Sequence, residues 1–255
     1  MDHYYWNDYD CHGCCNYWGG RSADAHPDPD RLYVHILVAA VWISAIPLLG
    51  KYIILGISGL LIFSINTQLL TIAAFLTCMV IFVFPLVLLG TVIPSLAKYA
   101  TDSMENTGKT AGMLGAYNTI ESILGTFLPT FLTIPTVGTA VTFLIFSGIL
   151  LLVSSIYFLN TGIKRITITA ATVLFVVCSV FGNSDKFAFW ETDLLYEGES
   201  VYNYLQVRDR DDSRILSTNV LFGVQSIMKK NSELTGMYYD YALAAPIMAQ
   251  IPKVK

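Results

Sequence analysis

The long runs without a charged side chain constrain this chain more than any other feature of its sequence. No Asp, Glu, Lys or Arg lies between Lys51 and Lys98, and none lies between Glu121 and Lys164. A helix that crosses the hydrocarbon core of a bilayer needs about 20 predominantly apolar residues. Because several such segments follow one another, the sequence predicts an integral membrane protein with several crossings, with the lipid bilayer as its surroundings.

Five segments are long and apolar enough to be predicted as membrane helices. Within the second of them, Pro85 and Pro94 are expected to bend the helix. Residues 52–65 are too short for a clear span, so they either cross or form a re-entrant or interfacial segment. The five predicted spans are residues 32–50, 69–97, 112–134, 139–159 and 166–181.

Basic residues between the spans predict their orientation, because Lys and Arg are enriched in short cytoplasmic loops. If residues 52–65 do not cross, all the basic loops fall on one side, and this is the arrangement that the rule favours. A complete crossing by residues 166–181 would then place the polar tail outside the cytoplasm, and the sequence leaves that open. The basic loop residues are Arg21, Arg31, Lys98, Lys109, Lys164 and Arg165.

The tail, residues 185–255, has the composition of a water-exposed unit and holds 18 of the 34 charged residues. Between Ser200 and Val207, Leu205 lies on one face and Gln206 on the other, and such alternation predicts a half-buried strand. "RDRDDSR" reads as a turn, and residues 215–222 as the returning strand of a hairpin that is marginal alone. The predicted fold is an α-helical polytopic membrane bundle (residues 32–184, after a polar leader, 1–31) followed by a small antiparallel β unit.

One predicted span carries a carboxylate, Glu121, near mid-membrane. An intramembrane carboxylate is costly and indicates a transport path, a proton relay or a paired charge. Alternatively, Glu121 is protonated and bonds Asn118 or a hydroxyl on a neighbouring helix. The same segment is rich in small residues that allow close helix packing in lipid: Gly112, Gly115, Ala116, Ser122 and Gly125.

Several stretches together resemble a known family. The loop "WGGRSADAHPDPDRLY", with Gly20, Arg21 and Asp24, is similar to the loop after the second helix of major-facilitator proteins. "FPLVLLGTVIPSLAKYA" and "GKTAGMLGAYNTIESILGTFLPTF" resemble the fourth and fifth helices of that superfamily. "ETDLLYEGESVYNYLQVRDRDDSRIL" and "VQSIMKKNSELTGMYYDYALAAPIM" resemble the N-terminal part of the aminopropyltransferase domain of spermidine synthases. The order and spacing of these stretches resemble the pattern of the membrane-fused spermidine synthase-like family.

This resemblance implies aminopropyl transfer from decarboxylated S-adenosylmethionine to a polyamine. It places Gln225 near the nucleoside cosubstrate and Tyr238 at the diamine. Tyr239 and Asp240 stand where the family often has His and Glu, and they belong to the same implied substrate site. Alternatively, Tyr238 and Tyr239 only pack the hairpin against the following helix.

In the family, the glycine-rich cofactor loop and the proton-accepting aspartate follow this region, whereas the sequence ends at "IPKVK". We therefore expect a fragment truncated at both ends. It has no catalytic residue or cofactor site of its own, and a Rossmann-like half is its expected partner. The alternative function is a major-facilitator-like transport or sensing module that uses Glu121.

Two other classes are excluded by composition and spacing. The formal net charge is −4 and no basic run occurs, so nucleic-acid binding is not expected. "CHGCC" offers Cys11, His12, Cys14 and Cys15, but a structural zinc site usually needs two spaced ligand pairs and no second pair follows. No metal site is predicted.

Overall fold

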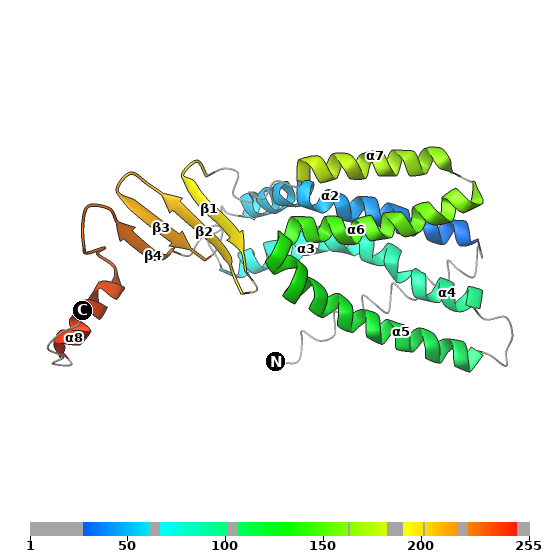
Figure 1. The fold of residues 1–255 in the computed structure, drawn as a ribbon, viewed down its shortest axis with the longest axis horizontal. Helices are drawn as coiled ribbons and strands as arrows, with labels where there is room; N and C mark the ends of the chain where they lie inside the picture. The colour runs from blue at the N-terminus through cyan, green and yellow to red at the C-terminus, as the bar shows by residue number, and fades with distance from the viewer. Residues whose placement is uncertain are drawn as a thin grey trace. The chain divides into compact units, whose positions relative to one another are not determined.

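The computed structural model forms two compact units, Met1–Ser184 and Asp185–Lys255, which are considered separately (Figure 1). The structure describes residues 28–61, 67–100, 107–162, 164–182, 191–200, 202–218 and 224–248. The predicted loop motif of Gly20, Arg21 and Asp24 lies outside the described residues, as does the cysteine-rich leader.

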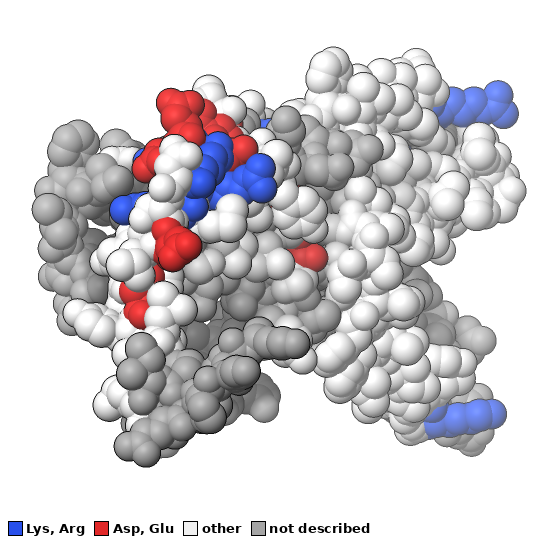
Figure 2. All heavy atoms as spheres, turned by 60° about the vertical axis from the view of Figure 1, so that its left-hand side comes forward, with Lys and Arg blue, Asp and Glu red and all other residues white. Residues whose placement is uncertain are grey.

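The first unit is entirely helical in its described part. Four of its helices are long and apolar enough to cross a membrane: Pro29–Ile57, Thr71–Tyr99, Gly108–Thr161 and Arg165–Gly182. Figure 2 shows their visible surface almost without charge, whereas charged side chains gather on the second unit. Its elements are α2 (Pro29–Leu61), α3 (Thr67–Gly90), α4 (Val92–Ala100), α5 (Thr107–Leu128), the π-helical turn η2 (Pro129–Thr133), α6 (Ile134–Thr161) and α7 (Arg165–Gly182).

The first helix is longer than the sequence predicted. Helix α2 continues through Leu61, so residues 52–61 extend the first helix and are not a separate segment, and the candidate span within it ends at Ile57. No proline follows Pro47 within α2. Nothing in this stretch therefore removes a backbone donor, and the helical hydrogen-bond ladder runs on.

The two prolines of the second predicted span behave differently. Pro85 lies inside α3, which continues to Gly90. The interruption falls at Thr91, between α3 and α4, and Pro94 is the third residue of α4. Because Pro94 has no N–H for the carbonyl of Gly90, four residues earlier, the ladder breaks there. The hydroxyl of Thr91 donates to the carbonyl oxygen of Leu88 at 2.7 Å.

A glycine separates the third and fourth predicted spans. The apolar helix Gly108–Thr161 is 54 residues long, well over the 20 or so that one crossing needs. Inside it, Gly138 has φ 82° and ψ 167°, which is not a helical conformation. This region of backbone space is essentially open only to glycine. Figure 1 shows α5 and α6 running in opposite directions on either side of this break.

The core of the helical unit is built around α2. Leu37 and Ala40 of α2 pack with Leu151 of α6 and Ala171 of α7. Small polar side chains, Ser44, Ser147 and Ser154, are fully buried on α2 and α6. Close packing was predicted instead for α5, and that prediction is wrong for the described residues. A Cβ added at Gly112, Gly115 or Gly125 would meet no atom within 4 Å.

Contacts within this unit place its basic helix ends together. The Tyr157 hydroxyl, near the end of α6, donates to Asp30 at the start of α2, 2.7 Å away. His35 of α2 lies 3.2 Å from the hydroxyl of Thr91, between α3 and α4. At the far end, Gly182 of α7 lies against Pro47. The ends that carry Arg31, Lys98, Lys109 and Lys164 therefore lie on one side (Figure 1).

The second unit holds a four-stranded antiparallel sheet in the order β1-β2-β3-β4, where the sequence predicted one hairpin. The predicted first strand begins late, because the Ser200 hydroxyl accepts the N–H of Asn203 at 3.0 Å and forms a turn. The predicted turn is also shorter, since Arg208 and Asp209 continue the strand. The elements are β1 (Leu194–Glu199), β2 (Tyr204–Asp209), β3 (Ser213–Ser217), β4 (Val224–Lys229), the 3-10 helix η3 (Tyr238–Ala244) and α8 (Ala245–Met248).

Candidate functional site

The four residues predicted to bind substrate lie on β4 and on the first turn of η3. Gln225 belongs to β4, next to a register irregularity in the β3–β4 pairing. Tyr238, Tyr239 and Asp240 open η3. Gly236, two residues before η3, has φ 82°. This left-handed conformation suits glycine and lets the chain turn back toward the sheet.

Tyr239 joins the two elements through one hydroxyl group. The N–H of Ile227 in β4 donates to the Tyr239 oxygen at 2.6 Å. The Tyr239 hydroxyl in turn donates to the carbonyl oxygen of Ile227 at 3.1 Å. β4 is an edge strand, and edge strands expose unpaired N–H and C=O groups. The phenol therefore occupies the place that a neighbouring strand would take at Ile227.

The carboxylate of Asp240 accepts hydrogen bonds from the turn that precedes η3. One carboxylate oxygen accepts the hydroxyl of Thr235 at 2.7 Å, and the other accepts the N–H of Gly236 at 2.6 Å. The hydrogen bond from Thr235, followed by those from the backbone, lowers the pKa of Asp240. The carboxylate is thus ionised at neutral pH and shapes the turn.

Tyr238 and Gln225 are the two predicted residues that face outward. The Tyr238 side chain is 73 % exposed, and Gln225 is exposed on β4. The Tyr238 ring contacts the Tyr239 ring edge to face, with centroids 5.3 Å apart. Of the two tyrosines that were alternatively expected only to pack against the hairpin, Tyr239 does contact the sheet, whereas the Tyr238 ring is exposed.

One face of the sheet carries a polar row that the sequence did not single out. Glu197 on β1 pairs with Gln206 on β2, which pairs with Ser217 on β3. Directly opposite residues of antiparallel strands share a face, so these three side chains form the polar row. The Tyr204 hydroxyl donates to Glu197. Burial, and then this bond to a carboxylate, raise the pKa of the Tyr204 phenol far above its usual value.

Gln206 is the most buried side chain of the polar row. It is 1 % exposed, and among the residues that the structure describes neither its amide nitrogen nor its amide oxygen has a hydrogen-bond partner. Ser217 is 2 % exposed, and its hydroxyl likewise has no hydrogen-bond partner in the described part of the chain. Strand alternation placed Gln206 opposite Leu205 correctly but did not say which face is buried. The pairing of β2 with β1 would have indicated the buried face, but the sequence did not predict β1 as a strand.

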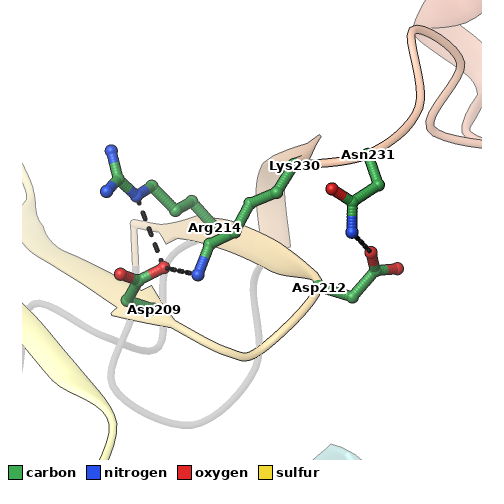
Figure 3. A network of polar contacts seen from close by, with 5 residues as sticks. All are labelled: Asp209, Asp212, Arg214, Lys230 and Asn231. Carbon is green, nitrogen blue, oxygen red and sulfur yellow. Dashed lines mark hydrogen bonds and ion pairs between the residues drawn. The ribbon is translucent and has the colours of Figure 1, made fainter.

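Beyond the polar row, charged residues tie the sheet together at two places. Arg208 of β2 bonds Glu191 at 3.1 Å. At the β2–β3 turn, Asp209 accepts from Lys230 at 2.8 Å and from Arg214 at 3.3 Å (Figure 3).

The same corner includes a second contact, in which Asn231 donates to Asp212 at 3.3 Å (Figure 3). These five residues form the corner network, which joins the turn to the end of β4. The Lys230 hydrogen bond, with help from Arg214, lowers the pKa of Asp209.

The two residues predicted to lie within the membrane, Glu121 and Asn118, do not form a site with any other described residue. Glu121 and Asn118 are exposed on α5. Among the residues that the structure describes, neither side chain has a hydrogen-bond or ion-pair partner; the Ser122 hydroxyl donates to the backbone oxygen of Asn118 at 2.8 Å. The described residues also contain no group of three or more His, Cys, Asp or Glu that could hold a metal ion.

Comparison with known proteins finds one informative likeness. A stretch of 94 residues is 58 % identical to a protein named "Probable polyamine aminopropyl transferase" from Bifidobacterium longum (strain NCC 2705). The match takes in 37 % of this chain and 21 % of that protein, so the chain spans about a fifth of the relative's length. No family model matches the chain, and no solved structure matches it.

The length of the match bears on the helical unit. Because 94 residues exceed the whole of Asp185–Lys255, the matched stretch includes part of the helical unit. The likeness supports the resemblance to spermidine synthase-like proteins. It gives no support to a major-facilitator relationship.

Proposed function

We propose that this chain is the membrane-embedded part of a polyamine aminopropyl transferase and that its tail forms one wall of the polyamine site. The observation that carries the proposal is the 58 % identity over 94 residues to a protein with that name. The four long apolar helices support insertion in a membrane. Decarboxylated S-adenosylmethionine is the expected cosubstrate. The described residues include no glycine-rich strand-to-helix loop to cradle it, so no step of the transfer is assigned to them.

The exposed part of the site suits a diamine in chemical terms. A protonated amine is attracted to the face of an aromatic ring, and the Tyr238 ring is 73 % exposed. The neighbouring Asp240 carboxylate carries a negative charge, because its pKa is lowered. The exposed amide of Gln225 adds a neutral hydrogen-bond acceptor. A dication with two separated ammonium groups matches these three features.

Binding of 1,4-diaminobutane to the full chain in detergent tests the proposal by calorimetry. Replacing Tyr238 by Ala is expected to weaken binding by about two- to fivefold, which corresponds to roughly 0.5–1 kcal/mol for an exposed cation–π contact. Tyr241→Ala is the matched control, since Tyr241 lies on the same 3-10 helix and is 82 % exposed. Equal binding of the uncharged 1,4-butanediol, or an equal loss in both variants, would contradict the proposal.

A further inference from the structure

The contact between Tyr239 and Ile227 closes a loop. The two residues are 12 positions apart, and the phenol meets both backbone groups of Ile227. The chain between them leaves β4, passes the corner network at Lys230 and turns at Gly236. Hence this pair of hydrogen bonds is what fastens the start of η3 to the edge of β4.

We propose that Tyr239 is a positioning residue: by holding the start of η3 to β4, it fixes Tyr238 relative to the strand that carries Gln225 and so sets the geometry of the polyamine wall. This inference rests on the proposed function. It gives Tyr239 a role different from substrate contact: its hydroxyl is used at Ile227, whereas the Tyr238 ring is free to meet a ligand. Tyr239 therefore acts through Tyr238.

Two further contacts transmit the position of Tyr239 to its neighbour. The rings of Tyr238 and Tyr239 meet edge to face with centroids 5.3 Å apart, so the orientation of one restricts the other. Asp240 fixes the backbone on the preceding side, through Thr235 and Gly236. With the turn held by Asp240 and the ring of Tyr239 held by Ile227, Tyr238 has little freedom left except about its own side-chain bonds.

The decisive variant is Tyr239→Phe, which keeps the ring and removes only the hydroxyl. In the full chain in detergent, we expect hydrogen exchange of the Ile227 amide, followed by NMR, to become about tenfold faster, because its acceptor is lost. We expect the affinity for 1,4-diaminobutane to fall about threefold, although no atom proposed to touch the ligand has changed. Tyr241→Phe, which removes a hydroxyl from the same 3-10 helix, is expected to change neither quantity.

The outcomes separate this inference from the proposed function. An unchanged exchange rate at Ile227 in Tyr239→Phe overturns the positioning role directly. Faster exchange with unchanged diamine affinity means that Tyr239 is only structural, which also overturns it. If the unmodified chain binds no diamine, the proposed function itself fails, and that failure is seen before any variant is compared.

Discussion

The buried amide of Gln206 makes a sharp prediction about stability. Its side chain is 1 % exposed, and within the described part of the chain both amide atoms are without a hydrogen-bond partner. Leaving such a group unpaired away from water costs about 1–3 kcal/mol in mutational data. Methionine has nearly the same length and shape without the polar atoms. We therefore expect Gln206→Met to raise the free energy of unfolding of the sheet by about 1–2 kcal/mol.

Native-state hydrogen exchange of the β2 and β3 amides, in the full chain in detergent, measures this change. Because 1.4 kcal/mol corresponds to a factor of ten, exchange is expected to slow by roughly five- to thirtyfold. Gln225→Met is the matched control: Gln225 is exposed on β4, and such a surface change is expected to stay within about 0.5 kcal/mol. Faster exchange in Gln206→Met would refute the reasoning, since it would show that the amide is hydrogen-bonded.

Two other predictions concern the corner network and the orientation of the helices. The pKa of the Asp209 carboxyl is lowered in the folded state. Its contribution to stability is therefore present at pH values above the pKa of the unfolded chain, near 3.8, and is lost as the pH falls through the lower pKa of the folded state. Protection of the β2–β3 hairpin, corrected for intrinsic exchange, is expected to be flat from about pH 7 to 5 and to fall below about pH 4; Asp209→Asn should remove this acid dependence. In a cysteine-free background, Asn160→Cys at the basic helix ends is expected to resist an impermeant thiol reagent in intact cells, whereas Tyr202→Cys should react. Labelling of both or of neither would contradict this orientation.

The positions of the helices could be predicted because long stretches without a charged side chain can be read directly from the sequence. Which helices touch cannot be read in this way. The small residues of α5, such as Gly112 and Gly115, read as a packing surface, yet the buried serines lie on α2 and α6. Small size permits close approach in any helix, so the choice depends on the three-dimensional arrangement.

The sheet and its site show the same limit. The alternation around Leu205 and Gln206 predicted a strand correctly, but β1 was missed because Glu197 and Glu199 lower its apparent strand character. The resemblance selected Tyr239 and Asp240 together with Tyr238. Only the structure shows that Tyr239 bonds Ile227, 12 residues earlier. The contact uses the backbone of Ile227, so no polar side chain in the sequence indicates it.

The backbone conformation of Gly138 decides how many times the chain crosses the membrane in the arrangement proposed above. As one rod, the 54 apolar residues of Gly108–Thr161 would measure roughly 80 Å, against a hydrocarbon core of about 30 Å. The turn at Gly138 folds this length into two legs, and with α7 the described helices of the proposed arrangement make an odd number of crossings. In that arrangement, an odd number of crossings predicts that the tail lies on the side opposite the basic helix ends. In the proposed arrangement, the conformation of one glycine therefore decides on which side of the membrane the sheet lies.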